Sequence, residues 1–187
     1  MAKKLALRQL FKEKRMSLTS HELSSASDAI LKQILDKNLF RGNQIMLYSA
    51  LIREHELPLD NWFNTLCQME IYLPKVLDDK GSMEAVLWEE SSGLVSNKWG
   101  ILEPTNNVFI DPKSIDVVVV PMLCFDSCGH RVGFGKGYYD RFLARCAPHT
   151  LTIGICFFDA VAPIEDTLDT DVPLDVVVTP RQLHYFN

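Results

Sequence analysis

Apolar and polar positions recur along the 187-residue chain with two different periods, and their order predicts an α/β protein. Residues 3–16 repeat apolar side chains every three to four positions, as an amphipathic helix does. A second helix is predicted to begin after Thr19, because Thr19 and Glu22 have the spacing of a capping box. The apolar stripes of the two helices consist of Leu7, Leu10 and Phe11 and of Leu23, Ala26, Ile30, Ile34 and Leu35.

Short runs of β-branched and apolar residues predict the strands. The clearest run, 115–122, is unbroken, which suits a strand that is buried on both faces of a parallel sheet. A short helix is expected over 58–67. Further strands are predicted at 44–49, 71–75, 83–88, 151–157 and 175–178. Together these elements predict a single domain, 1–187, built as a three-layer α/β/α sandwich of Rossmann-like type, with a mainly parallel central sheet and helices on both faces.

Composition and charge narrow the classes of function. The net charge of −5 gives no support for nucleic-acid binding. No apolar run approaches the length that crosses a membrane, and the basic N-terminal residues are not followed by the apolar core of a signal peptide. The five cysteines lack Cys-x-x-Cys spacing, which favours reduced thiols in a cytosolic protein over a zinc site. We therefore expect a cytoplasmic protein. We further expect a monomer whose partners are small molecules.

The stretch that carries candidate chemistry follows the strand predicted at 115–122. Three glycines alternate with other residues at Gly133, Gly135 and Gly137, and a helix is predicted to follow and to stop at Pro148. A glycine loop between a strand and a helix is typical of phosphate binding, because backbone N–H groups converge there and the helix N-terminus adds positive charge. Arg131 and Lys136 add whole charges.

This loop matches none of three well-known phosphate loops. Tyr138 stands where a dinucleotide fingerprint needs a third glycine, and Gly137 stands where a Walker-type loop needs Ser or Thr. A protein-kinase loop lies between antiparallel strands and not before a helix. The alternative is a turn that only connects two elements. That alternative does not explain the crowding of polar and charged residues at Arg131, Lys136, Tyr138, Tyr139, Asp140 and Arg141.

Two further patterns allow either a functional or a purely structural interpretation. The N-terminal helix carries a stripe of bases at spacings of three and four: Lys4, Arg8, Lys12 and Arg15. Such a stripe is usually a solvated helix face. The polar turn 49–56 follows a predicted strand, and ligands of open α/β sheets lie beyond the carboxyl ends of strands. It can equally be a charged surface turn.

One long segment resembles a known family. Val119–Pro121, Phe125–Asp126 and Gly129-His130-Arg131-Val132-Gly133-Phe134-Gly135-Lys136-Gly137-Tyr138-Tyr139-Asp140 are similar to the signature of the 5-formyltetrahydrofolate cyclo-ligase family, also called methenyltetrahydrofolate synthetase. The resemblance implies an ATP- and Mg²⁺-dependent ring closure of 5-formyltetrahydrofolate to 5,10-methenyltetrahydrofolate, with ADP and phosphate released through a phosphorylated, imidate-like formyl intermediate.

The resemblance also implies roles for individual residues. The ATP site would comprise Lys4, Arg8, Arg131, Val132, Gly133, Phe134, Gly135, Lys136, Gly137, Tyr138 and Tyr139. The folate site would comprise Ser49, Glu54, Trp99, Phe134, Gly135, Lys136, Gly137 and Tyr138. The ligands of Mg²⁺ would be Asp140 and Asp175. The groups expected to act directly in catalysis are Lys136, Arg131 and Tyr138. Phe134 departs from the family pattern, because that position is often basic or an aromatic hydroxyl.

Two other classes of function remain open on the sequence. A sugar-phosphate isomerase or an acyl-CoA transferase-like enzyme would bind phosphate at the same loop without hydrolysing ATP. A non-catalytic folate- or nucleotide-binding regulator would keep the fold and lose the chemistry. The intact set of candidate ligands argues against the regulator.

Overall fold

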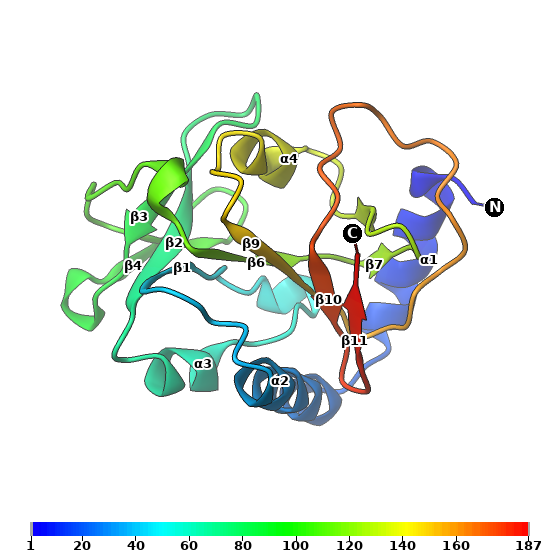
Figure 1. Ribbon diagram of the computed structural model, residues 1–187, viewed down its shortest axis with the longest axis horizontal. Helices are drawn as coiled ribbons and strands as arrows, with labels where there is room; N and C mark the ends of the chain where they lie inside the picture. Colours follow the sequence, from blue (N-terminus) through cyan, green and yellow to red (C-terminus); the bar gives the residue numbers. More distant parts are fainter. Residues whose placement is uncertain (1, 187) are drawn as a thin grey trace.

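The computed structural model describes residues 2–186, and within this range the main sheet has seven strands. Their order is β11-β10-β9-β6-β1-β2-β3. The five inner strands run parallel, and β3 and β11 join the two edges antiparallel. The bounds are β1 Gln44–Met46, β2 Glu70–Val76, β3 Met83–Leu87, β6 Val117–Pro121, β9 Leu151–Ile155, β10 Val176–Val178 and β11 Leu183–Tyr185. The predicted mainly parallel sheet is confirmed (Figure 1).

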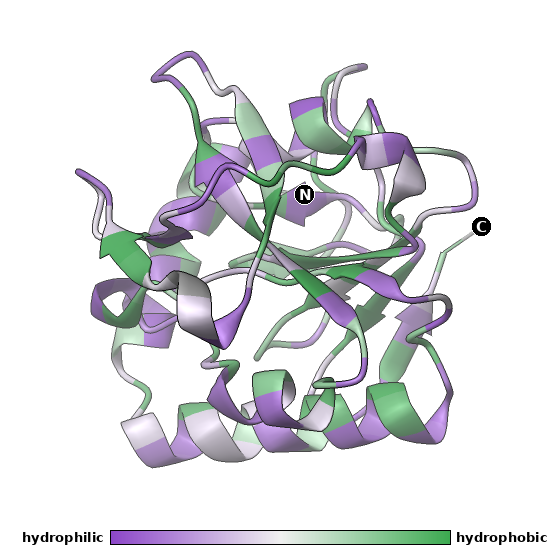
Figure 2. Cartoon of the chain, turned by 90° about the vertical axis from the view of Figure 1, so that its left-hand side faces the viewer, coloured by the Kyte–Doolittle hydropathy of each residue, from purple (hydrophilic) through white to green (hydrophobic). Residues whose placement is uncertain are grey.

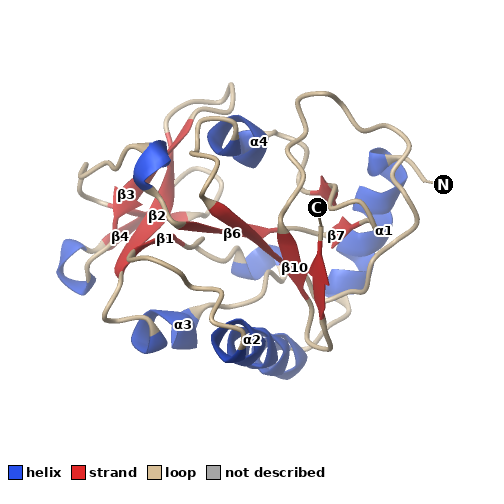
Figure 3. Cartoon of the chain, in the orientation of Figure 1, coloured by secondary structure: helices blue, strands red, loops and turns tan. Residues whose placement is uncertain are grey.

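Helices cover both faces of this sheet (Figure 3). Helices α2 (Ser20–Asp36) and α3 (Asp60–Thr65) pack on one face, and the short α4 (Tyr138–Leu143) packs on the other. Successive strand side chains point to opposite faces. Val117 and Val119 accordingly join the cluster under α2 and α3, whereas Val118 and Val120 join the cluster under α4. Figure 2 shows apolar residues concentrated in the inner strands, while the helices carry both apolar and polar positions.

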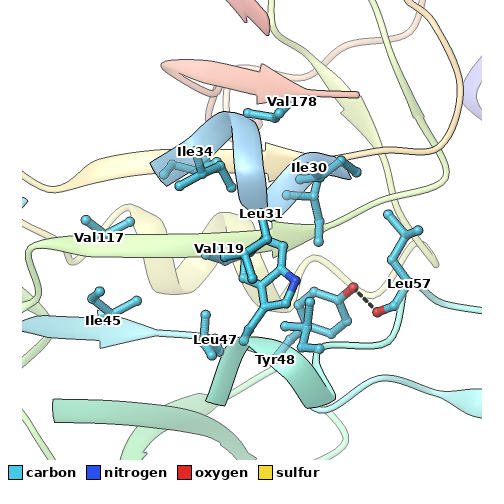
Figure 4. Packing of buried hydrophobic residues seen from close by; sticks show 14 of the residues in the cluster. Ile30, Leu31, Ile34, Ile45, Leu47, Tyr48, Leu57, Val117, Val119 and Val178 are labelled. Carbon is cyan, nitrogen blue, oxygen red and sulfur yellow. Dashed lines mark hydrogen bonds between the residues drawn. The ribbon is translucent and has the colours of Figure 1, made fainter. Parts of the chain in front are cut away.

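The larger core cluster lies between the sheet and α2 (Figure 4). Ile30 and Ile34 of α2 are fully buried there, and so is Trp62 of α3. The indole Nε1 of Trp62 donates to Oγ of Ser27 at 2.9 Å, so its buried polar atom is satisfied. The hydroxyl of Tyr48 donates to the carbonyl of Leu57 at 2.6 Å, which fixes the chain just beyond β1.

Helix α1 (Lys4–Met16) does not lie on a face of the sheet. It packs against a two-stranded hairpin, β7 (Cys124–Phe125) and β8 (Arg131–Val132), as Figure 1 shows. A strand, the glycine loop and a helix do follow one another as predicted, but the strand is β8 and not β6, because the segment after β6 folds back and pairs with itself before the glycine loop begins. The apolar contact surface of α1 is small, so Leu10 is exposed although Leu7 and Phe11 are buried.

The remaining short elements complete the chain. A second hairpin, β4 (Leu94–Ser96) and β5 (Leu102–Pro104), was not predicted. The 3₁₀ turns are η1 Ile52–Glu54, η2 Glu90–Ser92 and η3 Pro112–Ser114. The capping box is confirmed, with the Thr19 amide donating to Glu22 at 2.8 Å and the Glu22 amide donating to Thr19 at 3.2 Å. Leu35 of α2 is exposed, contrary to prediction. In residues 2–186 no helix is long and apolar enough to cross a membrane.

Candidate active site

The two central strands, β1 and β6, mark the point where the chain reverses its direction across the sheet. From β1 the chain moves to β2 on one side, whereas β6, β9 and β10 follow one another on the other side. In open α/β sheets the crevice beyond the carboxyl ends of such strands binds ligands. The segments that leave β1 and β6 at this edge are 47–56 and 122–123, so the polar turn 49–56 lies where the sequence predicted.

The basic stripe of α1 faces this region. Nε of Arg8 donates to the carbonyl of Gly133 at 2.8 Å, and Nζ of Lys12 lies 3.2 Å from a carboxylate oxygen of Glu54. Lys12 and Arg15 both contact the ring of Phe134, at 4.8 and 5.3 Å from its centre. The interpretation of the stripe as a solvated helix face is therefore wrong. The helix joins the glycine loop to the turn after β1.

Lys4, at the start of the stripe, pairs with a different segment. Its ammonium forms an ion pair with Asp171, and its backbone N–H donates to Asp166 at 2.7 Å. The stripe thus runs from the 166–171 loop, past the glycine loop, to the turn that carries Glu54. A stripe of this kind can hold a long anionic ligand along its length.

Two of the three alternating glycines are required by the backbone. Gly135 has φ +90°, and a Cβ there would lie 3.1 Å from the guanidinium of Arg8. Gly137 has φ +67° and precedes the first turn of α4. Both values lie in the left-handed region, which favours glycine. Gly133 has no positive φ, and an added Cβ would meet no heavy atom within 4 Å, so its Cα is open on that side.

Arg141 holds the glycine loop from the opposite side. Its guanidinium donates to the carbonyl of Lys136 and, at 3.1 Å, to the carbonyl of Gly81. Lys136 itself is exposed, and no carboxylate of residues 2–186 forms an ion pair with its ammonium. The loop is thus anchored through its backbone while the Lys136 side chain is available to a ligand.

Arg131 and Asp140 form an ion pair beside the loop. Nη2 of Arg131 lies 2.6 Å from Oδ1 of Asp140, and Nη1 donates to the carbonyl of Val172 at 2.5 Å. The Val172 amide donates to the same carboxylate oxygen at 3.2 Å. Burial lowers the pKa of Arg131, and the charge of Asp140 opposes that shift. Val132, in contrast, is buried in the α1 cluster, so only its backbone can face a ligand.

The second predicted metal ligand, Asp175, lies at the amino end of β10. Its Oδ2 accepts from the amide and from the hydroxyl of Thr152, both at 2.7 Å. Asp140 and Asp175 therefore have different neighbours. Residues 2–186 contain no group of three or more His, Cys, Asp or Glu side chains placed to hold a metal ion. A cation here would need oxygens from a ligand as well, and Mg²⁺ commonly takes phosphate oxygens and water.

Two of the aromatic residues predicted for the folate side, Trp99 and Tyr138, lie together, whereas Phe134 lies against α1. The ring of Trp99 packs edge-on against Tyr138, with 6.5 Å between centres. The Tyr138 hydroxyl donates to the carbonyl of Asp78 at 3.0 Å. Ser49 is half-buried just after β1. Tyr139 packs into the cluster under α4, and burial raises the pKa of its hydroxyl.

Glu56 and Arg15 are buried at the same end of the sheet. The exposed fraction is 7% for Glu56 and 5% for Arg15. A carboxylate oxygen of Glu56 accepts from the Leu51 amide at 2.8 Å, which closes the turn that carries Glu54. Burial raises the pKa of Glu56 to about 7, and the positive charge of Arg15 opposes this shift.

Comparison with known proteins places the chain among folate enzymes. The sequence profile of the 5-formyltetrahydrofolate cyclo-ligase family matches residues 1–180. The chain belongs to the 5-formyltetrahydrofolate cyclo-ligase family. A probable 5-formyltetrahydrofolate cyclo-ligase from Schizosaccharomyces pombe is 26% identical over 204 residues, which cover 97% of each chain. The resemblance and the enzyme class predicted from the sequence are confirmed.

Two solved structures of methenyltetrahydrofolate synthetases have the same fold. The one from Aquifex aeolicus matches with a TM-score of 0.85 and 28% identity, and the match covers 98% of this chain and 93% of that one. The one from Mycoplasma pneumoniae matches with a TM-score of 0.71 and 28% identity over 95% and 98%.

No functional role was predicted from the sequence for two residues of this cyclo-ligase, Arg15 and Glu56. Arg15 belongs to the basic stripe and Glu56 to the polar turn, and both patterns favour charges at the surface. Their burial depends on how α1 packs against β7, β8 and the turn η1, which no local pattern reveals. The only sign in the sequence that they belong to the site is their position close to the predicted ligands, Arg15 after Arg8 on the same helix and Glu56 after Glu54 in the same turn.

Replacement of Glu56 by glutamine is expected to change how the stability of this cyclo-ligase depends on pH. The folded-state pKa of about 7 exceeds the ordinary value of 4.5, so the unfolding free energy falls as the pH rises from about 4.5 through 7. Glu56→Gln removes this titration. Its stability relative to the wild type should therefore be greater at pH 8 than at pH 5 by roughly 2 kcal/mol. Urea unfolding at the two pH values measures it, and a difference independent of pH contradicts the assignment.

Proposed function

We propose that the protein catalyses the ATP- and Mg²⁺-dependent conversion of 5-formyltetrahydrofolate to 5,10-methenyltetrahydrofolate. The observation that carries the proposal is the meeting of two predicted half-sites at Phe134. Arg8 binds the backbone of the glycine loop at Gly133, and Lys12 links Phe134 to Glu54. A nucleotide at the loop and a folate at the turn would then share one loop, as phosphoryl transfer between them requires.

The chemistry begins from a poor leaving group, the oxygen of the N5-formyl group. Transfer of the γ-phosphoryl group from ATP to this oxygen forms a C–O–P linkage and releases ADP. The lone pair of N10 then attacks the formyl carbon, the N10 proton leaves, and the C–O bond breaks with its electrons on phosphate. The products are the methenyl compound, ADP and phosphate. No covalent bond to the enzyme is needed, so the protein acts by positioning and by stabilising charge.

Cationic side chains of the glycine loop and of α1 are assigned to neutralise the negative charges of the transferred phosphoryl group. Lys136, exposed and free of carboxylates in the described chain, would neutralise the γ-phosphate. Arg8, held against Gly133, would bind the polyphosphate with the backbone amides of the loop. Lys4 would join them by exchanging Asp171 for phosphate. Arg131 would act through Asp140, which it orients.

The metal ion is assigned to Asp140, with Asp175 as the second predicted ligand. One oxygen of Asp140 accepts from Arg131 and Val172, and the other would bind the ion. When bound with ATP, Mg²⁺ supplies charge neutralisation and a template for the phosphates. On the folate side, Glu54 would accept from ring N–H groups, and Trp99 and Tyr138 would form an aromatic wall with Ser49 nearby.

An ADP-release assay with and without 5-formyltetrahydrofolate tests the proposal. We expect ADP release that depends on the folate and equals the methenyl product formed. Phosphate binding without ADP release would favour a sugar-phosphate isomerase or acyl-CoA transferase-like enzyme. Folate binding without product would favour the regulator. We also expect the protein to be a single-domain monomer in the cytoplasm.

Replacement of Glu54 by alanine is expected to raise the KM for 5-formyltetrahydrofolate about 10- to 100-fold, because it removes hydrogen bonds to a charged group. The KM for ATP should change far less. Steady-state kinetics with each substrate varied in turn measure both values, and Glu13→Ala, on an exposed position of α1, controls for the loss of one carboxylate. A larger effect on ATP than on folate would refute the assignment.

Replacement of Asp140 by asparagine is expected to have two effects. It leaves the buried guanidinium of Arg131 without its ion-pair partner, so the unfolding free energy should fall by about 1–3 kcal/mol. It should also raise the Mg²⁺ concentration for half-maximal activity by about tenfold, because a neutral amide binds Mg²⁺ more weakly than a carboxylate. Chemical denaturation without metal measures the first effect and a Mg²⁺ titration the second. An unchanged titration contradicts the metal assignment.

A further inference from the structure

Arg15, in the last turn of α1, has a buried guanidinium with free donors. The residue retains 5% of its exposure, and among residues 2–186 no group accepts a hydrogen bond from its Nε or Nη2. Buried polar groups in proteins are almost always hydrogen-bonded, and a buried charge without a partner is costly. A guanidinium in this state points to an acceptor that the protein itself does not supply.

The charge of Glu56 acts on Arg15 more strongly than that of Glu54, but Glu56 does not accept a hydrogen bond from these donors. The two side chains attract each other across the site, yet they form no ion pair within 4.0 Å in the described chain. One carboxylate oxygen of Glu56 is engaged by the Leu51 amide. Glu56 therefore stabilises the charge of Arg15 from a distance and leaves room between them.

That room is a small cavity at the carboxyl ends of β1, β6 and β9. Its volume is about 10 Å³, and its walls include Arg15, Tyr48, Glu56, Met122 and Phe158. This is close to the minimum of roughly 10–15 Å³ that one water-sized group needs. The Tyr48 hydroxyl already donates to Leu57, and Met122 and Phe158 are apolar. The cavity fits a single acceptor atom.

Two residues of this cavity lie next to residues that are predicted for the folate site. The guanidinium of Arg15 also contacts the ring of Phe134, at 5.3 Å from its centre, and Glu56 closes the turn that carries Glu54. Folate has carbonyl oxygens at the ring 4-position and on the N5-formyl group. A carboxylate that accepts from ring N–H groups and a guanidinium that donates to a carbonyl oxygen are complementary to one such ring system.

We propose that Arg15 is a substrate-binding residue whose Nε–H and Nη2–H donate to a carbonyl oxygen of the bound folate, either the ring 4-oxo group or the N5-formyl group. This inference rests on the proposed function, since it names a further residue of the same folate site.

Replacement of Arg15 by glutamine tests this directly. Isothermal titration of 5-formyltetrahydrofolate without ATP should show about 10- to 100-fold weaker binding, the loss expected for hydrogen bonds to a charged group. The KM for ATP should stay within about twofold. Lys14→Gln, an exposed change of the same charge on the same helix, should bind folate like the wild type. Unchanged folate affinity in Arg15→Gln overturns the proposal.

A double variant separates substrate contact from charge compensation. Arg15→Gln leaves Glu56 buried without its opposing charge, and the additional Glu56→Gln change removes that problem. If Arg15 contacts folate, the double variant keeps the weak folate binding. If Arg15 only offsets the charge of Glu56, the double variant regains wild-type affinity and the proposal fails. Should Arg15→Gln not fold, Arg15→Lys provides the same comparison, with an expected loss of at least about fivefold in folate affinity.

The two carbonyl oxygens are distinguished by tetrahydrofolate, which lacks the formyl group. A similar loss of affinity for both ligands assigns the contact to the ring 4-oxo group. A loss confined to 5-formyltetrahydrofolate assigns it to the formyl oxygen. Measurements on the wild type test the proposed function separately from the role of Arg15. If the wild type neither binds nor converts 5-formyltetrahydrofolate, the proposed function fails. If it does both and Arg15→Gln binds equally well, only the role of Arg15 fails.

Discussion

Replacement of Lys136 by methionine is expected to lower kcat/KM for the cyclo-ligase reaction by about 10²- to 10³-fold, the loss seen when one group that stabilises transition-state charge is removed. The ammonium of Lys136 is exposed and has no carboxylate partner within residues 2–186. Its removal should therefore leave the unfolding free energy within about 0.5 kcal/mol of the wild type. Steady-state kinetics and urea unfolding measure the two quantities.

A control variant shows whether the effect belongs to the position or only to the charge. Lys32 of α2 is exposed and pairs with Asp36 one turn further along the same helix. Lys32→Met makes the same change in net charge. Lys32 is far from the glycine loop in the sequence and belongs to the helix that covers one face of the sheet. Wild-type turnover in Lys136→Met, or an equal loss in Lys32→Met, would contradict a role at the transferred phosphate.

Replacement of Gly135 by alanine is expected to damage both stability and ATP use. At φ +90° a Cβ is strained by roughly 1–2 kcal/mol, and here it would also lie 3.1 Å from the Arg8 guanidinium. We expect the unfolding free energy to fall by about that amount. Displacement of Arg8 from the Gly133 carbonyl should raise the KM for ATP at least about tenfold, because misplaced phosphate ligands no longer act together.

Gly133 provides the matched comparison for stability. It belongs to the same alternating series, but its φ is not in the left-handed region and no heavy atom lies within 4 Å of the position of an added Cβ. Gly133→Ala should unfold at the same urea concentration as the wild type, whereas Gly135→Ala should unfold earlier. If the two variants are equally stable, the glycines do not differ in the way that the backbone indicates.

The sequence alone predicted the elements whose signals are local. The capping box at Thr19 and the apolar run in β6 depend on neighbouring residues, and both were confirmed. These two features follow from the periods of the regular structures and from the chemistry of adjacent positions. The expectation that Arg8 belongs to the phosphate site came from the family resemblance, and Arg8 does bind the glycine loop.

Very short strands and contacts between distant segments were missed. The hairpins β4–β5 and β7–β8 have strands of two or three residues, too short to produce a period. The packing of α1 against β7, β8 and η1 decides that Arg15 is buried, while the stripe pattern alone favoured solvent. The ion pair of Arg131 with Asp140 joins two residues of the signature that were predicted to bind different parts of Mg²⁺-ATP.

The proposed activity can be measured by following the absorbance of methenyltetrahydrofolate while the purified protein is supplied with 5-formyltetrahydrofolate, ATP and Mg²⁺. We expect the methenyl chromophore to grow with time, to require ATP, and to appear in equal amount with ADP. A folded protein that forms no chromophore, or forms it equally fast without ATP, would contradict the proposed function.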